Sequence, residues 1–271
     1  MEVPLDPLAA SLGAEVGVFG GSGFYDFVRD AEDIEIDTPF GRPAAPVRVG
    51  TLAGRRVAFV ARHGRAHEFA AHRVPFRANV WALASLGVAS IVAPCSVGSL
   101  QPHLGVGDFV VVDQLVDRTH GRAGTFHDAG SGDGLPGSDG PVHHQPFADP
   151  YDARVRGALL AAGDELGGPT VHDGGTMVVI NGPRFSTRAE SRWYTTMGWD
   201  VVNMTGAPEA VLTAEAGVPY AAVALVTDRD AGDPDRPDGA APVTMEDVMA
   251  TVRHNVAHVR RLIELALPHL P

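Results

Sequence analysis

The sequence predicts an α/β fold in which helices flank a central sheet of buried strands. Short apolar runs rich in β-branched residues recur along the chain, without the alternation of a strand that has one solvated face. Such runs are typical of strands buried on both faces. Stretches with helical spacing separate several runs, and 271 residues with 45% hydrophobic content can form a sizeable core.

The predicted strands and helices follow one another along the chain. Each apolar run ends in a glycine-rich or polar corner, and the runs with their corners are EVGVFGGSG, RRVAFVARHG, ASIVAPCSVGS, DFVVVDQ, TMVVINGPR, WDVVNMTG and PYAAVALVTD. Helices are predicted over residues 74–86, 152–166, 187–197 and 208–216. Thr187 and Glu190 form a capping-box pattern at the start of the third. A last helix is predicted behind Thr244 as its N-cap, because apolar residues recur there every three or four positions up to Ala266.

No repeat and no change of composition marks a domain boundary. We therefore expect a single domain over residues 1–271, with residues 1–15 as a flexible N-terminal extension. Residues 121–141 are rich in Gly, Ser and Asp and are predicted to form a surface loop. Residues 229–242 follow a predicted strand directly, so a lid over a site and a plain surface loop are equally good interpretations.

The charge balance argues against several classes of function. Acidic residues outnumber basic ones by 33 to 21, a formal net charge of −12, so we expect neither nucleic acid nor an anionic membrane as a partner. The uncharged stretch 78–107 is broken at Gly87, Pro94 and Gly98 into pieces too short to span a membrane. A single cysteine, Cys95, rules out an internal disulfide, and no secretion signal is recognisable, so we expect a cytoplasmic protein.

The corners after the predicted strands are the candidate ligand-binding segments, because ligands of open α/β sheets collect at the carboxyl ends of strands. The first corner, GVFGGSGFYDF, surrounds Ser22 with glycines whose backbone N–H groups can approach an anion. It lacks the third glycine of a dinucleotide fingerprint and the Lys-Ser/Thr pair of a Walker loop. A tight turn without a ligand is an equally good interpretation of this segment alone.

The second corner, ARHGRAH, supplies Arg62, His63, Arg65 and His67. A guanidinium group matches phosphate oxygens, and an imidazole adds another donor, although a solvated basic turn is the alternative. His67 and His72 are five residues apart, one more than a helical zinc pair requires, so we predict no metal site.

Three further corners carry polar, thioether and aromatic side chains. APCSVGS contains Cys95 and Ser96, and we expect Cys95 to be packed rather than catalytic. NGPRFSTRAE offers Phe185 and Ser186, while VVNMTGAPEA offers the residues Asn203, Met204, Thr205 and Glu209. A ring and a thioether can stack on a base or line a sugar, or can belong to the core. Glu209 is expected to be an ordinary first-turn helix carboxylate, with orientation of a hydroxyl as the alternative.

The last predicted strand ends in VTDRD, where Asp228 and Asp230 are two residues apart. At strand spacing both carboxyl groups point to the same side and can accept from an exocyclic amine or protonate a ring nitrogen. Burial favours the protonated form that a general acid needs at neutral pH. A solvated acidic loop is the alternative.

Taken in order, these segments resemble the 5'-methylthioadenosine phosphorylases, in the trimeric branch of the purine nucleoside phosphorylases. The resemblance extends from about Val16 to the last helix, and its motifs are GVFGGSGF, DTPFGRP, ARHGRAH, RANVWAL, VGSL, GDFVVVDQLVDRT, INGPRFSTRAES, DVVNMTGAPEAVLTAEAG and TDRD. It implies a single domain with a mixed sheet, a homotrimer, and phosphorolysis of a purine nucleoside with inorganic phosphate as co-substrate and no cofactor.

The resemblance also implies a role for each matching residue. Phosphate would be held by Ser22, Arg62, His63, Ser96 and Thr205. The nucleoside would be held by Met204 at the ribose, Phe185 and Ser186 beside the base, Met245 and Val248 at the 5' substituent, and His144 lent by a neighbouring subunit. Asp228 and Asp230 would recognise adenine and serve as the catalytic pair.

Two residues depart from the family pattern. Cys95 stands where a hydroxyl residue is common, and a thiol is a weaker hydrogen-bond donor. Arg229 stands between the two aspartates, where an aromatic residue is frequent. Three alternatives therefore remain open: a phosphorylase of 6-oxopurine nucleosides such as inosine and guanosine, a hydrolytic nucleosidase, and a non-catalytic nucleoside-binding homologue.

Overall fold

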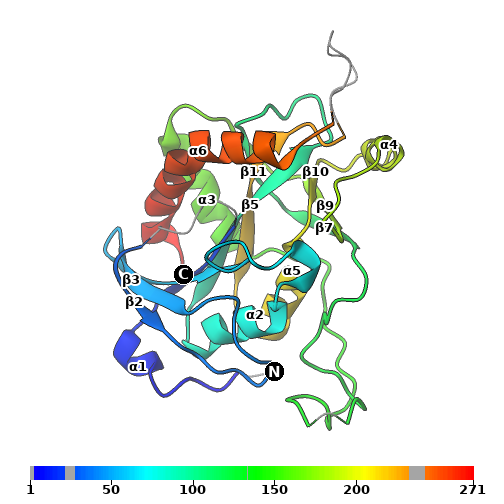
Figure 1. The fold of residues 1–271 in the computed structure, drawn as a ribbon. Coiled ribbons are helices and arrows are strands. Elements are labelled where there is room, and N and C mark those ends of the chain that lie inside the picture. Colours follow the sequence, from blue (N-terminus) through cyan, green and yellow to red (C-terminus); the bar gives the residue numbers. More distant parts are fainter. Residues whose placement is uncertain (1–2, 22–27, 133, 232–241) are drawn as a thin grey trace.

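The computed structural model describes residues 3–271 except 22–27, 133 and 232–241, and within them one sheet of eleven strands forms the centre of the molecule (Figure 1). The strands are β1 (Val16–Gly20), β2 (Arg29–Ile34), β3 (Val47–Leu52), β4 (Arg55–Ala61), β5 (Ser90–Ser99), β6 (Phe109–Val111), β7 (Gln114–Arg118), β8 (Val171–Asp173), β9 (Thr176–Ile180), β10 (Val201–Asn203) and β11 (Tyr220–Asp228).

The sheet is mixed and branches at β5. The main path runs β2-β3-β4-β1-β5-β10-β9-β7, while β11 pairs with β5 and β6, and β6 pairs with β8. Strand β5 is parallel to β1 and β11 but antiparallel to β10. Because β1, β4, β5 and β11 are mutually parallel, their carboxyl ends lie at the same edge of the sheet.

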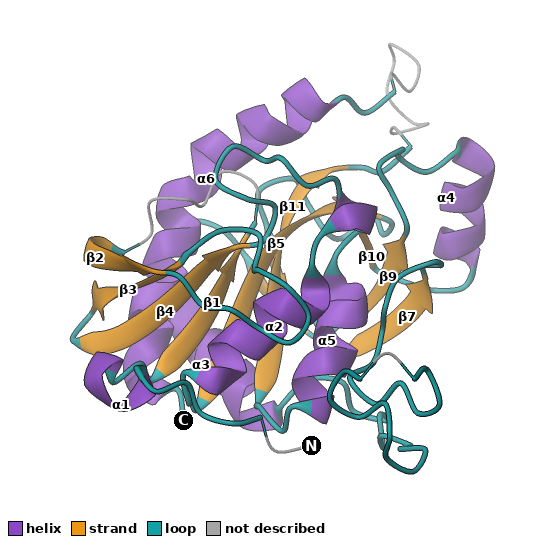
Figure 2. Ribbon diagram, turned by 60° about the horizontal axis from the view of Figure 1, so that its bottom comes forward, coloured by secondary structure: helices purple, strands orange, loops and turns teal. Residues whose placement is uncertain are grey.

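Helices cover both faces of the sheet (Figure 2). They are α1 (Ala9–Leu12), α2 (Phe76–Ser85), α3 (Ala153–Leu166), α4 (Arg188–Thr196), α5 (Gly206–Glu215) and α6 (Met245–Ala266), with short 3-10 turns at Ala71–Arg73 and Leu267–His269. Helices α2 and α5 lie together on one face, and α3 and α6 lie together on the other. The sequence-based prediction of an α/β fold with a central mixed sheet flanked by helices is confirmed.

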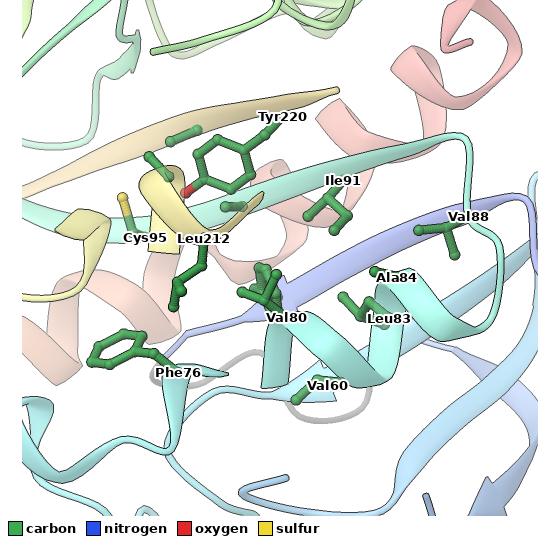
Figure 3. Close-up of a cluster of buried hydrophobic side chains, with 14 of the residues drawn as sticks. Val60, Phe76, Val80, Leu83, Ala84, Val88, Ile91, Cys95, Leu212 and Tyr220 are labelled. Atoms are coloured by element: carbon green, nitrogen blue, oxygen red, sulfur yellow. The ribbon is translucent and has the colours of Figure 1, made fainter. Parts of the chain in front are cut away.

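Neighbouring residues of a central strand belong to two different hydrophobic cores. Ile91 of β5 faces the core under α2 and α5, and the adjacent Val92 faces the core under α3 and α6. Figure 3 shows part of the first core, with Val80 of α2, Leu212 of α5 and Ile91 of β5 among its labelled side chains. Each such side chain contributes about 1.5–3 kcal/mol by leaving water, which explains the unbroken apolar runs.

The amino-terminal segment, expected to be a flexible extension over residues 1–15, is described from residue 3 onward. Its described part, residues 3–15, lies against the core, with Val3 and Leu12 buried. The backbone N–H of Asp6 donates to the carbonyl of Ser85 at the end of α2. Apolar contacts and this hydrogen bond tie the segment to the face that α2 covers.

The predicted apolar runs correspond to β1, β4, β5, β6, β9, β10 and β11, and all predicted helices are present. The capping boxes of α4 at Thr187 and of α6 at Thr244 are formed as the sequence indicates. Strands β2, β3, β7 and β8 were not predicted. They lie toward the ends of the sheet paths, where exposed charged residues such as Glu32 and Asp117 replace an apolar run.

The structure describes most of one segment that was expected to be irregular, and little of the other. The described residues of 121–141 form no helix or strand, as predicted, although Phe126 anchors the segment in a buried cluster with Phe40 and Trp81. Of residues 229–242, positions 232–241 lie outside the described part of the chain.

None of the helices described is both long and apolar enough to cross a membrane.

Candidate active site

A cavity of about 500 Å³ lies where the carboxyl ends of β4, β5 and β11 meet the residues that follow β9 and β10. Its walls come from segments far apart in the sequence, which the sheet brings to one edge. Ten of the thirteen residues predicted for the site line it: Arg62, His63, Ser96, Phe185, Met204, Thr205, Asp228, Asp230, Met245 and Val248.

Arg62 follows β4 directly and is held rigidly at the cavity wall. Its side chain is only 1% exposed and forms a two-point ion pair with Glu209 of α5, with Nε 2.6 Å from Oε2 and Nη2 3.0 Å from Oε1. Nη1 donates to the carbonyl of Pro94 at 3.3 Å. Burial opposes the guanidinium charge, but Glu209 outweighs it and raises the pKa of Arg62.

His63 is the neighbouring cavity residue and is neutral. Its Nδ1 lies 2.8 Å from the carbonyl of Phe69, which can only accept, so Nδ1 carries the hydrogen and Nε2 is left as an acceptor. Burial, assisted by the charge of Arg62, lowers the pKa of His63 to about 4. The ring stacks on that of His67, with centroids 4.5 Å apart.

Hydroxyl groups from β5 and from the start of α5 lie at the same wall. Asn203 organises them, because its Oδ1 accepts from the backbone N–H groups of Thr205 and Gly206 at 2.7 Å each, and its Nδ2 donates to the carbonyl of Ser96 at 3.0 Å. The Ser96 hydroxyl is buried and has no hydrogen-bond partner within the described residues. Such a group requires a partner, which a bound ligand can supply.

Asp228 ends β11, where the register against β5 shifts between Val226 and Asp228. The bulge turns the carboxyl group into the cavity, and Thr227 donates its hydroxyl hydrogen to Oδ2 at 2.8 Å. Burial raises the pKa of Asp228 to about 7, with the charge of Asp230 acting in the same direction. A substantial fraction of Asp228 is therefore protonated at neutral pH.

Asp230 is buried beside Asp228, and its Oδ2 has no hydrogen-bond partner in the described part of the chain. Burial raises its pKa, while the hydroxyl groups of Ser191 and Ser186, which lie next to the carboxyl group, act in the opposite direction. An unpartnered buried carboxylate oxygen can accept from an amine of a bound ligand.

Two of the described site residues predicted from the sequence do not line the cavity. Ser186 lies next to the carboxyl group of Asp230 and is not among the residues that line the cavity. His144 is exposed, away from the cavity of its own chain, and its expected contribution to a neighbouring subunit stays a prediction. Ser22 lies outside the described residues.

Comparison with known proteins identifies the family. The model of the phosphorylase superfamily matches residues 15–268. The chain belongs to the phosphorylase superfamily. Among relatives of this superfamily member, S-methyl-5'-thioadenosine phosphorylase of Mycolicibacterium smegmatis is 52% identical over 93% of the chain and 90% of the relative. A purine nucleoside phosphorylase of Streptomyces coelicolor is 45% identical over 97% of the chain and 92% of the relative.

Solved structures support the same assignment. Methylthioadenosine phosphorylase from Schistosoma mansoni in complex with adenine is similar with a TM-score of 0.86 and 37% identity, covering 94% of the chain and 91% of that structure. A methylthioadenosine phosphorylase from an antarctic soil metagenomic library is similar with a TM-score of 0.83 and 37% identity, over 94% of the chain and 85% of that structure.

The sequence analysis missed several features of this superfamily member's site. The partnership of Glu209 with Arg62 is the main one, because we expected an ordinary helix carboxylate. Gly98 and Glu68 also line the cavity, and neither was singled out from the sequence as a site residue. One sequence signal points to the role of Glu209 as the partner of Arg62. Glu209 lies four residues after Thr205, on a predicted helix that starts at a candidate corner.

Cys95 lines the cavity but is not a nucleophile. Its side chain is 5% exposed, and burial raises the pKa of its thiol to about 12. The thiol therefore stays protonated at neutral pH, whereas a nucleophilic cysteine needs a thiolate. The expectation that Cys95 is a packed residue agrees with this environment.

Proposed function

We propose that this chain catalyses phosphorolysis of 5'-methylthioadenosine, or of a related 5'-substituted adenine nucleoside, to adenine and the sugar 1-phosphate. The proposal is carried by one observation: a single cavity pairs two buried carboxyl groups with a separate set of hydroxyl, imidazole and guanidinium groups. The names of the relatives at 52% and 50% identity support the same activity. On this proposal the chain is a pentosyltransferase.

Inorganic phosphate would bind at the end of the cavity that Arg62, His63, Ser96 and Thr205 line. The hydroxyl groups and the free N–H groups of Arg62 would donate to its oxygens, and neutral His63 would accept from a protonated oxygen at Nε2. Ser22 would complete this site from the glycine-rich segment that follows β1.

Adenine would bind at Asp228 and Asp230. Its exocyclic 6-amine donates hydrogen bonds, which a carboxylate oxygen accepts and which the 6-carbonyl oxygen of an oxopurine cannot donate. Protonated Asp228 would donate to N7, and Ser186 would support this end from beside Asp230. Phe185 and Met204 would contact the base and the ribose, and Met245 and Val248 at the start of α6 would receive the 5' substituent.

In the reaction, a phosphate oxygen forms a bond to C1' of the sugar while the bond from C1' to N9 of the purine breaks. The bonding electrons move into the purine, and Asp228 delivers its proton to N7, so neutral adenine leaves. Positive charge develops on the sugar in the transition state, and the adjacent phosphate anion stabilises it. The protein mainly positions phosphate, which needs no covalent catalyst and no cofactor.

We also infer a cytoplasmic homotrimer. Exposed His144 supports the trimer, because a residue remote from its own cavity can reach the 5' end of a nucleoside bound by a neighbour. Light scattering on the purified protein at micromolar concentration would give the mass of three chains; a mass of one or two chains would contradict the inference.

One alternative has a specific observation in its favour. A relative at 45% identity is named a purine nucleoside phosphorylase, so a chain that prefers 6-oxopurines such as inosine and guanosine is the second candidate. The carboxyl groups of Asp228 and Asp230 favour an amine over a carbonyl, and we therefore prefer adenine nucleosides.

The deciding experiment is an assay of base release from 5'-methylthioadenosine, adenosine and inosine, each with and without phosphate. We expect the highest kcat/KM with methylthioadenosine and no release without phosphate. Faster inosine cleavage would establish the 6-oxopurine alternative. Undiminished release without phosphate would identify a hydrolytic nucleosidase, and no release under any condition would indicate a non-catalytic nucleoside-binding homologue.

A further inference from the structure

The ion pair between Arg62 and Glu209 is the most deeply buried one described in the chain, with side chains 1% and 2% exposed. Two buried charges cost free energy unless each is paired and its hydrogen-bonding groups are satisfied. Glu209 meets this condition, since its Oε1 also accepts from the hydroxyl of Tyr220 at 2.9 Å. Tyr220 is buried next to this pair, and Figure 3 shows its ring among the side chains of the core.

The pairing determines which donors of Arg62 remain for a ligand. A guanidinium group has five N–H donors. Glu209 takes the one on Nε and one on Nη2, and Pro94 takes one on Nη1. One donor on Nη1 and one on Nη2 are left, and these can serve two oxygens of a single anion.

The direction of the free edge is also constrained. A Cβ atom on Gly21 would lie 3.2 Å from Nη1 of Arg62 and 3.3 Å from the carbonyl oxygen of Pro94. The guanidinium group thus lies against Glu209, Pro94 and Gly21, and cannot rotate without breaking the ion pair. Its free donors keep one orientation at the cavity wall.

The helix that carries Glu209 also begins at the cavity. Thr205 precedes α5, and Asn203 fixes it by accepting from the backbone N–H groups of Thr205 and Gly206. This short segment, whose backbone leaves the helical conformation at Ala207, carries a hydroxyl group at the wall and, four residues later, the carboxylate that orients Arg62.

The geometry points to Glu209 as a positioning residue for the co-substrate: supported by the Tyr220 hydroxyl, it fixes the guanidinium of Arg62 so that two N–H groups meet phosphate. This inference rests on the proposed phosphate site. Glu209 itself touches neither phosphate nor nucleoside. A bidentate partner on Nε and Nη2 leaves Arg62 a pre-organised donor, so less entropy is lost when phosphate binds.

The test compares two variants with two matched controls. Glu209→Gln keeps the shape of the side chain and removes its charge, and Tyr220→Phe removes only the supporting hydroxyl. The controls are Glu215→Gln, a buried glutamate on the same helix that accepts from Thr125 and Phe126, and Tyr151→Phe, whose ring stacks on Tyr220. The contacts described for these two controls are with Thr125, Phe126 and Tyr220.

Adenine release is measured first with the phosphate concentration varied at saturating methylthioadenosine. It is then measured with the methylthioadenosine concentration varied at saturating phosphate. We expect the phosphate KM to rise about tenfold or more in Glu209→Gln and about two- to tenfold in Tyr220→Phe, because the lost hydrogen bonds involve charged groups. The nucleoside KM should stay within about twofold. A purely structural role would change both KM values, or kcat alone.

Two results would overturn the inference. One is an unchanged phosphate KM in folded Glu209→Gln; if that variant does not fold, an unchanged phosphate KM in Tyr220→Phe is sufficient. The other is an equal phosphate KM increase in the controls. If the wild-type chain releases no adenine, the proposed function fails separately, and calorimetric titration of inorganic phosphate into the same proteins decides the positioning role by comparing Kd values.

Discussion

Gly98 of β5 and Asp228 of β11 approach each other so closely that a Cβ atom on Gly98 would lie 2.8 Å from Oδ1 of Asp228. The same Cβ would lie 3.0 Å from Cα of Asp230. Real Cβ contacts of this length essentially do not occur, so only glycine allows β5 to lie against the bulge that carries both aspartates. The approach helps to fix where the two carboxyl groups point.

Gly98→Ala is therefore expected to displace both carboxyl groups and to lower kcat/KM for methylthioadenosine by about a hundredfold, since small misplacements of catalytic groups are costly. The KM for phosphate should change less. The control is Gly157→Ala on α3, where a Cβ would meet no atom within 4 Å and alanine favours the helix. Equal activity of the two variants would remove Gly98 from the mechanism.

The pH dependence of kcat should report Asp228. Its pKa of about 7 means that the protonated form, which can deliver a proton to N7, declines above neutral pH. We expect kcat at saturating substrates to fall about tenfold per pH unit well above pH 7, and Asp228→Asn to have a low kcat without this decline. Measurements between pH 5.5 and 9 check both, and a flat wild-type profile would contradict the assignment.

The same carboxyl group should make folding stability depend on pH. The folded-state pKa of about 7 lies above the ordinary aspartate value of 3.8, so the contribution of Asp228 to stability is fully present below pH 3.8 and is lost as the pH rises through 7. Asp228→Asn avoids this loss, and its Tm should exceed that of the wild type by more at pH 8 than at pH 5. Thermal denaturation at both values is the measurement, and equal Tm differences would refute the prediction.

The capping box of α6 couples stability to nucleoside binding. The Thr244 hydroxyl accepts from the backbone N–H of Asp247, and the Asp247 carboxylate accepts from the backbone N–H of Thr244, at 3.2 Å each. Thr244→Ala should lower the free energy of unfolding by about 1 kcal/mol. Because Met245 and Val248 lie in the first turn, the nucleoside KM should also rise while the phosphate KM does not.

Denaturant titration and steady-state kinetics measure these two effects. Thr196→Ala is the control, since the hydroxyl of Thr196 donates to the carbonyl of Arg192 at the far end of α4, on an exposed side chain. It should leave both KM values unchanged. If the phosphate KM rises together with the nucleoside KM in Thr244→Ala, the prediction is contradicted. The start of α6 would then affect more than binding of the 5' substituent of the nucleoside.

The sequence predicted the parts of the fold whose residues are apolar on both faces. Strands such as β5 and β11 were evident because Ile91 and Val92 must both be buried. Strands β2, β3, β7 and β8 were missed, since their partly exposed residues make no continuous apolar run. Such strands depend on their pairing partners more than on their own composition.

The candidate site was predicted in the same uneven way. Residues at the corners after buried strands were found, because topology alone brings such corners together. The contact between Arg62 and Glu209 joins positions that are 147 residues apart in the sequence. The close approach of Gly98 to Asp228 depends on a β-bulge. No local sequence pattern predicts either contact. Placement of Asp230 against Ser191 of α4 is another product of the tertiary structure.

Because Glu209 already balances Arg62 and both are sealed from solvent, the guanidinium group projects no attractive field toward an arriving anion. The chain as a whole carries a formal charge of −12, so phosphate must diffuse toward it against repulsion. Dissolved salt shortens the range of that repulsion. Raising the ionic strength with sodium chloride should therefore increase kcat/KM for phosphate, and a decrease would reveal long-range electrostatic attraction. Capture of phosphate then depends on contact, not on steering from a distance.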